Sequence, residues 1–121
     1  MQAKTNDTTV ARGREAEMRA ERHLQNQGLR PVDRNFRIRG GEIDLIMRDG
    51  STLVFVEVRQ RSGSDFGGAA ASITAIKQSR IILAARYYLA RHGDCACRFD
   101  CVLFDAGVLT WIRDAFVVDS F

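Results

Sequence analysis

The sequence contains no hydrophobic run that approaches the roughly 18 residues of a membrane-spanning helix. Its first residues also lack the apolar core of a secretory signal peptide. We therefore expect a cytoplasmic protein with no membrane segment. The 121 residues show no internal repeat and no linker-like stretch, and this length suits one domain better than two.

Cysteine is scarce, and the three residues lie close together at Cys95, Cys97 and Cys101. An odd number of cysteines in a chain of cytoplasmic character argues against a disulfide framework. A zinc site would need a fourth ligand, for which His92 is the nearby choice. We favour the alternative that these residues are small, partly buried thiols near a strand.

Lysine is rarer still, because every basic residue except Lys4 and Lys77 is an arginine. The formal net charge is +3, but the charge is unevenly distributed. Six basic residues and one acidic residue lie between Arg59 and Arg91, and the chain after Arg91 is mainly acidic. Arginine binds phosphate through paired hydrogen bonds, so the basic stretch suits a phosphate-facing surface. A solvent-exposed helix face would carry the same charges.

Periodicity and turn signals predict an α/β domain over residues 11–121, after a flexible tail at residues 1–10. The expected order is α-β-β-β-α-β-β, a mixed β-sheet flanked by helices. A Gly- and Ser-rich loop is expected at 61–71. The predicted elements are a helix over 11–27, strands over 31–38, 42–47 and 53–59, a helix over 72–92, and strands over 98–105 and 108–118.

The side-chain pattern also predicts which faces are buried. Ala16, Ala20 and Leu24 share one face of the first helix, and Glu17 lies beside that face. In the strand at 53–59 both faces are apolar, which predicts a central strand covered on each side. The second helix is broadly apolar, with a stripe formed by Ile76, Leu83, Tyr87 and Ala90.

Three acids interrupt the apolar segment GEIDLIMRDGSTLVFVEVRQR at residues 41–61, namely Glu42, Asp44 and Glu57. The turn signal Asp49-Gly50 predicts a hairpin in which Asp44 and Glu57 project toward one point. One interpretation is structural, with Glu57 paired to its same-face neighbour Arg59. The other is a Mg²⁺ or Mn²⁺ site, because hard oxygen ligands suit these ions.

The spacing of these residues resembles the PD-(D/E)-x-K nuclease motif, with Asp44, twelve intervening residues, and then Glu57-Val58-Arg59. More closely, the chain resembles the YraN family of small uncharacterised bacterial proteins. The matching segments are G-x-x-A-E-x-x-A-x-x-x-L at 13–24, R-N-x-R-x-x-x-G-E-I-D-L-I at 34–46, and F-V-E-V-R-x-R at 55–61. The resemblance implies a restriction-endonuclease-like fold related to Holliday-junction resolvases, which are often homodimers.

Carried over residue by residue, the resemblance implies that Asp44, Glu57 and the Val58 carbonyl bind a metal ion. Glu17 corresponds to the helix acid of resolvase-type sites, and we expect it to complete the metal shell or to hold a second ion. Glu42 is either a further ligand or a residue that terminates the site. Nearby basic and amide side chains would bind the nucleic acid, at Arg61, Lys77, Gln78 and Arg80.

Arg59 departs from the motif, because active nucleases of this class usually carry lysine at this position. Arginine does not deprotonate, so it does not act as a general base. It is able to orient the attacking water or stabilise the phosphate through charge-assisted hydrogen bonds.

Three hypotheses of function follow. The first is a metal-dependent DNA endonuclease that acts on branched or otherwise structured DNA. The second is a nucleic-acid-binding protein that has the nuclease fold without efficient cleavage, as Arg59 suggests. The third is a protein-interaction subunit, which the three converging acids disfavour.

Overall fold

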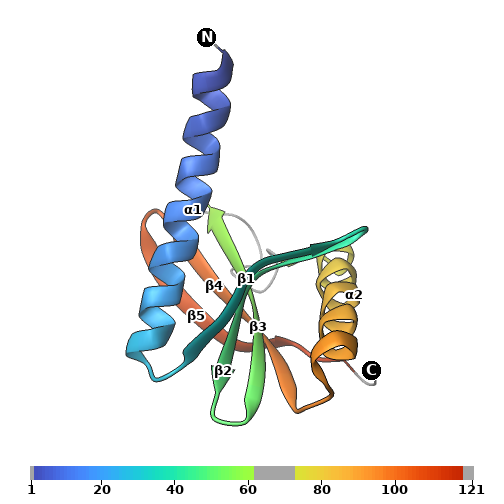
Figure 1. Cartoon of the computed structure of the whole chain (residues 1–121). Helices are drawn as coiled ribbons and strands as arrows, with labels where there is room; N and C mark the ends of the chain where they lie inside the picture. The colour runs from blue at the N-terminus through green and yellow to red at the C-terminus, as the bar shows by residue number, and fades with distance from the viewer. Residues whose placement is uncertain (1, 62–72, 119–121) are drawn as a thin grey trace.

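The computed structural model describes residues 2–61 and 73–118, with side chains from Val10 onward. Two helices and five strands follow the predicted order α-β-β-β-α-β-β, which confirms the α/β class (Figure 1). The elements are α1 Gln2–Asn26, β1 Arg30–Ile38, β2 Gly41–Asp49, β3 Thr52–Arg61, α2 Ala75–His92, β4 Cys97–Asp105 and β5 Val108–Phe116.

The strands form one mixed sheet in the order β1-β2-β3-β4-β5, so β3 is central as predicted. Only β3 and β4 run parallel among these neighbours, and α2 falls between them in the chain, as a parallel connection requires. The predicted hairpin is present, because Asp49 and Thr52 are Cα partners at the turn between β2 and β3. Gly50 supplies the left-handed backbone conformation of this turn, with φ 61°.

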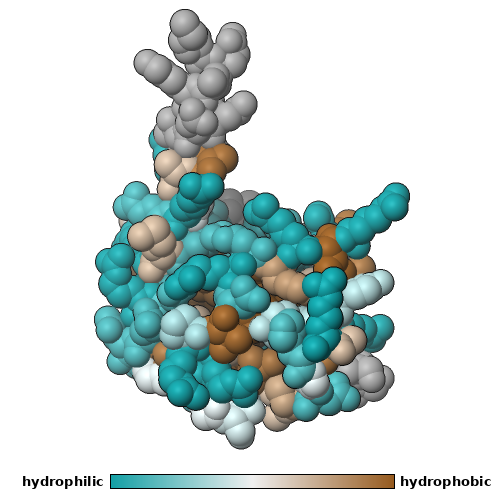
Figure 2. Space-filling view, in the orientation of Figure 1, coloured by the Kyte–Doolittle hydropathy of each residue, from teal (hydrophilic) through white to brown (hydrophobic). Residues whose placement is uncertain are grey.

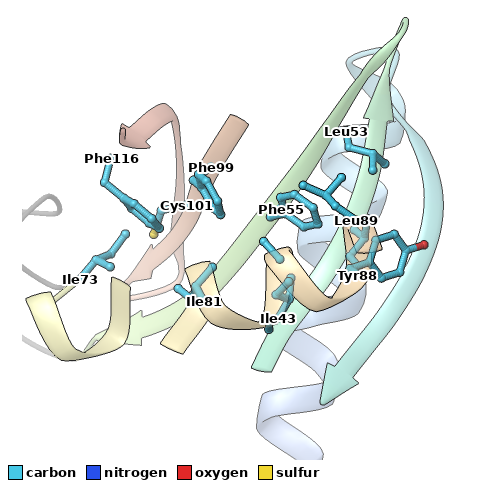
Figure 3. Close-up of a cluster of buried hydrophobic side chains, with 13 residues drawn as sticks. Ile43, Leu53, Phe55, Ile73, Ile81, Tyr88, Leu89, Phe99, Cys101 and Phe116 are labelled. Atoms are coloured by element: carbon cyan, nitrogen blue, oxygen red, sulfur yellow. The ribbon is translucent and has the colours of Figure 1, made fainter. Parts of the chain in front are cut away.

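Each face of the sheet has its own hydrophobic core. On one face Phe55 of β3 packs against Tyr88 of α2, with ring centroids 6.1 Å apart (Figure 3). On the other face Val56 of β3 lies in a cluster with Leu24 of α1. The two helices therefore sandwich the sheet, and the alternation predicted for β3 is confirmed.

The buried face of α2 differs from the predicted stripe. Ile76 and Tyr87 are 74% and 51% exposed. The reason is that α2 is apolar over most of its circumference, so its own periodicity does not select the face that packs. The sheet instead receives a neighbouring stripe with small residues at its centre, formed by Ile81, Ala84, Ala85, Tyr88 and Leu89.

Two other boundaries or patterns differ from the predictions. Helix α1 begins at Gln2 instead of about Ala11, so residues 2–10 are helical where we expected a tail (Figure 1). Strict alternation along β2 would place Ile43 and Leu45 on the same face, but Ile43 packs on the α2 face and Leu45 on the α1 face, so the alternation breaks near Asp44. Of the predicted loop at 61–71, Arg61 ends β3, and residues 62–71 lie outside the described residues.

Hydrophilic residues cover most of the face seen in Figure 2. In the described part of the chain, no helix has the combination of length and apolar character that a membrane span needs.

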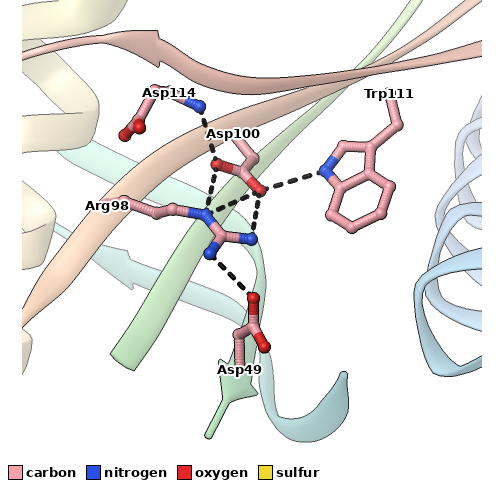
Figure 4. A network of polar contacts seen from close by, with 5 residues as sticks. All are labelled: Asp49, Arg98, Asp100, Trp111 and Asp114. Carbon is pink, nitrogen blue, oxygen red and sulfur yellow. Dashed lines mark hydrogen bonds and ion pairs between the residues drawn. The ribbon is translucent and has the colours of Figure 1, made fainter. Parts of the chain in front are cut away.

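An ion pair within β4, formed by Arg98 and the buried Asp100, also connects this strand to the end of β2 and to β5. The Arg98 guanidinium donates to Asp100 at 3.0 Å and to Asp49 at 2.8 Å (Figure 4). The Asp100 carboxylate is fully buried and also accepts hydrogen bonds from the Trp111 indole and the Asp114 backbone N–H. Trp111 also packs against the core on the α1 face, so it covers that core from the edge strand β5.

We expect Asp100→Asn to lower the free energy of unfolding by about 3–5 kcal/mol, because it removes one charge of a buried ion pair. Urea denaturation measures this loss. Trp111→Phe removes a single hydrogen bond to the same carboxylate and should cost about 1 kcal/mol. Equal losses in the two variants would contradict the view that the charge pair dominates.

Candidate active site

A pair of carboxyl groups from neighbouring strands forms the centre of the site. Leu45 of β2 and Val56 of β3 are Cα partners, and the adjoining residues of each strand are Asp44 and Glu57. Both carboxyl groups line the same cavity, and Glu57 is close enough to raise the pKa of Asp44. The Val58 N–H donates to Asp44 Oδ2 at 2.8 Å, which fixes this carboxyl group. The hairpin thus brings together the two acids that the sequence singled out.

Burial of this pair changes the protonation of Asp44. Loss of water around the carboxyl group, followed by the nearby charge of Glu57, raises the pKa of Asp44 to about 8. The Val58 N–H opposes this rise but does not overcome it. At neutral pH the free protein therefore holds a proton between two adjacent carboxyl groups, a situation that a bound cation would relieve.

Two basic side chains approach Glu57, which is only 6% exposed. Lys77 Nζ of α2 lies 3.5 Å from Glu57 Oε2, and Arg59 Nη1 of β3 lies 3.6 Å from the same oxygen. The structural interpretation of Glu57 and Arg59 as a same-face ion pair is thus correct in geometry. This ion pair is compatible with the functional interpretation, because Asp44 and Lys77 also lie beside the Glu57 carboxylate.

A cavity of about 170 Å³ opens onto the carboxyl pair. Glu17 of α1 lines it, because burial of Ala16 and Ala20 against the sheet places the intervening Glu17 at the edge of the interface. Partial burial raises the pKa of Glu17, and a hydrogen bond with Asn35 opposes this rise. Four acids face this space together with two bases, namely Glu17, Glu42, Asp44, Glu57, Lys77 and Arg80.

Glu42 lies at the rim of the cavity. Its carboxylate is 3.6 Å from Arg37 Nε and 3.7 Å from Arg80 Nη2, and its side chain is 44% exposed. Glu42 is therefore paired with arginines, in contrast to the carboxyl pair formed by Asp44 and Glu57. This arrangement favours the interpretation that it terminates the site.

The other predicted binding residues separate into two groups. Lys77 and Arg80 line the cavity, whereas Gln78 turns to the start of α2 and donates to the Ile73 carbonyl at 3.1 Å. Arg61 lies in an adjoining hollow and contacts Asp105 at 2.9 Å.

The adjoining hollow was not predicted from the sequence. It has a volume of about 540 Å³ and shares Ala16 and Gln60 with the cavity. Three arginines line it, Arg12 and Arg19 from α1 and Arg61 from β3. The Gln60 side chain donates to the Arg12 carbonyl at 3.3 Å where α1 crosses the end of β3 (Figure 1). A basic surface therefore continues from the acidic cavity along α1.

The donor set fits a magnesium or manganese ion better than a closed metal site. Within the described residues, no three His, Cys, Asp or Glu side chains are grouped to hold a metal ion. This leaves the zinc interpretation of the cysteines without support there, and burial raises the pKa of Cys101 to about 12. Mg²⁺ typically takes one or two carboxylates and fills its shell with water and substrate phosphate. Asp44, Glu57 and the Val58 carbonyl match that requirement.

Gly41 permits α2 to reach the site. A Cβ atom at this position would collide with the Arg80 carbonyl and touch Ala84, both on α2. The absent side chain therefore lets the helix backbone lie directly on the start of β2. This close approach places the first turns of α2, which carry Lys77 and Arg80, over the carboxyl pair. The motif G-E-I-D-L-I thus contributes a packing residue that sequence reasoning did not recognise.

We expect Gly41→Ala to lower the free energy of unfolding by about 1–3 kcal/mol, because α2 must shift to accommodate the methyl group. Chemical denaturation measures the change. The matched control is Gly13→Ala in α1, where an added Cβ meets no atom within 4 Å. That helical substitution should instead stabilise the protein by about 0.5–1 kcal/mol.

Stability of the metal-free protein should fall as pH rises from about 4 to about 8. In this window the folded state keeps a proton on Asp44 that the unfolded state has lost, because the folded pKa is raised to about 8. The slope is at most about 1.4 kcal/mol per pH unit for one proton. Asp44→Asn should flatten the dependence, measured by urea denaturation in EDTA, and Asp94→Asn in an exposed loop should not. Parallel curves for wild type and Asp44→Asn would refute this assignment.

Comparison with known proteins agrees with these motifs. A family model described as "Uncharacterised protein family UPF0102" matches residues 16–104. A UPF0102 protein of Dechloromonas aromatica (strain RCB) is 71% identical, over 99% of this chain and 100% of the relative. UPF0102 proteins of Cupriavidus taiwanensis and Aeromonas hydrophila are 60% and 56% identical, over 91% and 88% of this chain and 86% and 85% of the relatives. The chain therefore belongs to the UPF0102 family, which is the YraN family that its motifs resemble.

Proposed function

We propose that this protein is a Mg²⁺- or Mn²⁺-dependent endonuclease that hydrolyses phosphodiester bonds in branched or otherwise structured DNA. The supporting observation is the pair formed by the half-buried Asp44 and the buried Glu57, which opens onto a cavity that Lys77 and Arg80 also line. Paired carboxylates suit a divalent cation, and bases beside them suit an anionic substrate. The preference for branched DNA rests on the resemblance to Holliday-junction resolvases.

Hydrolysis joins a water oxygen to phosphorus and breaks the bond between phosphorus and one ester oxygen. The water loses a proton, and the departing oxygen gains one. When bound by Asp44, Glu57 and the Val58 carbonyl, Mg²⁺ or Mn²⁺ would act as a Lewis acid toward phosphate and water. Glu17 and Glu42 are the half-buried carboxylates of the cavity outside the central pair, and Glu42 is paired with arginines. We therefore assign Glu17 as acceptor of the water proton.

The adjoining hollow supports DNA as the partner. Its three arginines, Arg12, Arg19 and Arg61, lie next to the cavity along α1. A continuous strand whose scissile phosphate lies at the carboxyl pair would place neighbouring phosphates along this surface. Arginine donates paired hydrogen bonds to phosphate oxygens, so the hollow suits the sugar–phosphate backbone without reading bases.

A second candidate function is DNA binding without cleavage. Arg59 favours it, because the arginine occupies the position where nucleases of this class usually have lysine. Under this alternative the cavity and the hollow bind DNA in a salt-sensitive manner, and no metal ion supports strand scission. A single cleavage assay with added metal ions therefore distinguishes the two candidate functions.

We expect the purified protein to cut a synthetic four-way DNA junction when Mg²⁺ or Mn²⁺ is added, and to be inactive in EDTA. Asp44→Asn and Glu57→Gln should each lower the cleavage rate by at least about 100-fold, because both carboxylates hold the ion. Gel analysis of end-labelled strands measures the rate. Calorimetric binding of Mn²⁺ should be present in the wild type and absent in Asp44→Asn.

Asp94→Asn is the matched control, since this exposed loop aspartate lies outside the cavity. It should keep both cleavage and Mn²⁺ binding. Cleavage that persists in Asp44→Asn would point to a contaminating nuclease. Mn²⁺ binding without cleavage of any branched or duplex DNA would leave the binding function as the better description.

A further inference from the structure

We propose that Lys77, rather than Arg59, supplies the cation that contacts the phosphate held at the carboxyl pair. The proposal rests on the proposed function. In the nuclease motif the residue at the position of Arg59 supplies this cation, and we assign that role to Lys77 of α2 instead. Three observations carry it, namely the packing of Arg59, the placement of Lys77, and the arrangement of the other bases.

Arg59 is held away from the cavity. It is not among the described residues that line this space. Its side chain is 28% exposed, and its Nε atom is buried without a hydrogen-bond partner among the described residues. The guanidinium contacts Glu57 Oε2 through Nη1 at 3.6 Å. A packed group that already faces Glu57 is poorly placed to move onto a phosphate.

Lys77 lines the cavity and reaches the same oxygen from α2, with Nζ 3.5 Å from Glu57 Oε2. Its side chain is 47% exposed, so its four-carbon stem has room to shift. The backbone at this position is fixed, because the Lys77 N–H donates to the Thr74 hydroxyl that caps α2. A rigid backbone with a mobile ammonium is the combination that a phosphate contact needs.

The remaining base of the cavity is engaged elsewhere. Arg80 Nη2 contacts Glu42 Oε1 at 3.7 Å, at the rim of the cavity. Among the described bases that line the cavity, Lys77 is therefore the one that faces the carboxyl pair. In the free protein its ammonium partly balances Glu57, and it becomes available to a phosphate oxygen once another cation takes over this balance.

The test uses three methionine variants of the full chain and two readouts. Lys77→Met removes the proposed contact, and Arg59→Met removes the motif arginine. Arg91→Met is the control, because Arg91 lies about 21 Å further along α2 and stacks on Phe36 instead. The first readout is the rate of four-way junction cleavage with Mn²⁺. The second is the salt dependence of junction binding with Ca²⁺ in place of Mn²⁺, which keeps a divalent cation at the carboxyl pair, with gel analysis to check that the junction stays uncut.

Lys77→Met should lower the cleavage rate by at least about 100-fold. It should also reduce the magnitude of the salt slope by about 0.9, the value for one lost phosphate contact. Lys77→Arg should restore the salt slope, because the charge is kept. Arg59→Met should leave the slope unchanged and cleave faster than Lys77→Met. Thermal denaturation of each variant identifies any that fails to fold.

An unchanged salt slope in folded Lys77→Met would overturn the proposal, as would loss of cleavage in folded Arg59→Met but not in Lys77→Met. The proposed nuclease function and the role of Lys77 are contradicted by different results. If the wild type binds the junction but never cuts it, the nuclease function falls. In that case a reduced slope confined to Lys77→Met still supports Lys77 as the phosphate contact.

Discussion

The close approach of the Asp44 and Glu57 carboxyl groups is the interaction on which the rest of the site depends. Two neighbouring acids with little water around them do not both ionise without compensation, and the raised pKa of Asp44 reflects this cost. The surrounding elements reduce this electrostatic cost in two ways. The β3 backbone donates the Val58 N–H, and α2 brings the ammonium of Lys77. The fold thus keeps two carboxyl groups close together at a cost in electrostatic free energy, although hydrophobic packing does not require them there.

Small residues at the helix–sheet contacts set the distances in this arrangement. Ala16 and Ala20 let α1 lie against one face, so Glu17 reaches the cavity from a helix. Gly41 and Ala84 let α2 lie against the other face. Both cores extend to the edge of the site, because Ile81 of one core and Ala16 of the other also line the cavity (Figure 3 shows Ile81). Packing therefore fixes the helices firmly while it leaves a small polar space at one end.

The parts of this arrangement that the sequence predicted are those encoded locally. Alternation along β3 and the Asp49-Gly50 turn are short-range signals, and they sufficed for the central strand, the hairpin and the pairing of Asp44 with Glu57. The face of α2 that packs, and hence the approach of Lys77 to Glu57, depends on a contact between segments far apart in the chain. A linear motif also implies that the residue after Val58 enters the site. In the structure Arg59 reaches Glu57 Oε2 at 3.6 Å, but it is not among the described residues that line the cavity.

Under the proposed function, the net charge of the cavity determines whether a DNA phosphate enters it with or without a metal ion. Its lining contains four carboxyl groups and two bases, so even with one shared proton it carries a net negative charge. A phosphodiester is itself an anion, and it would be repelled from this space while attracted to the arginines of the adjoining hollow. A divalent cation neutralises the two carboxylates of the pair and removes that repulsion. Binding along the hollow and entry of a phosphate into the cavity are therefore separable events, and only the second requires the ion.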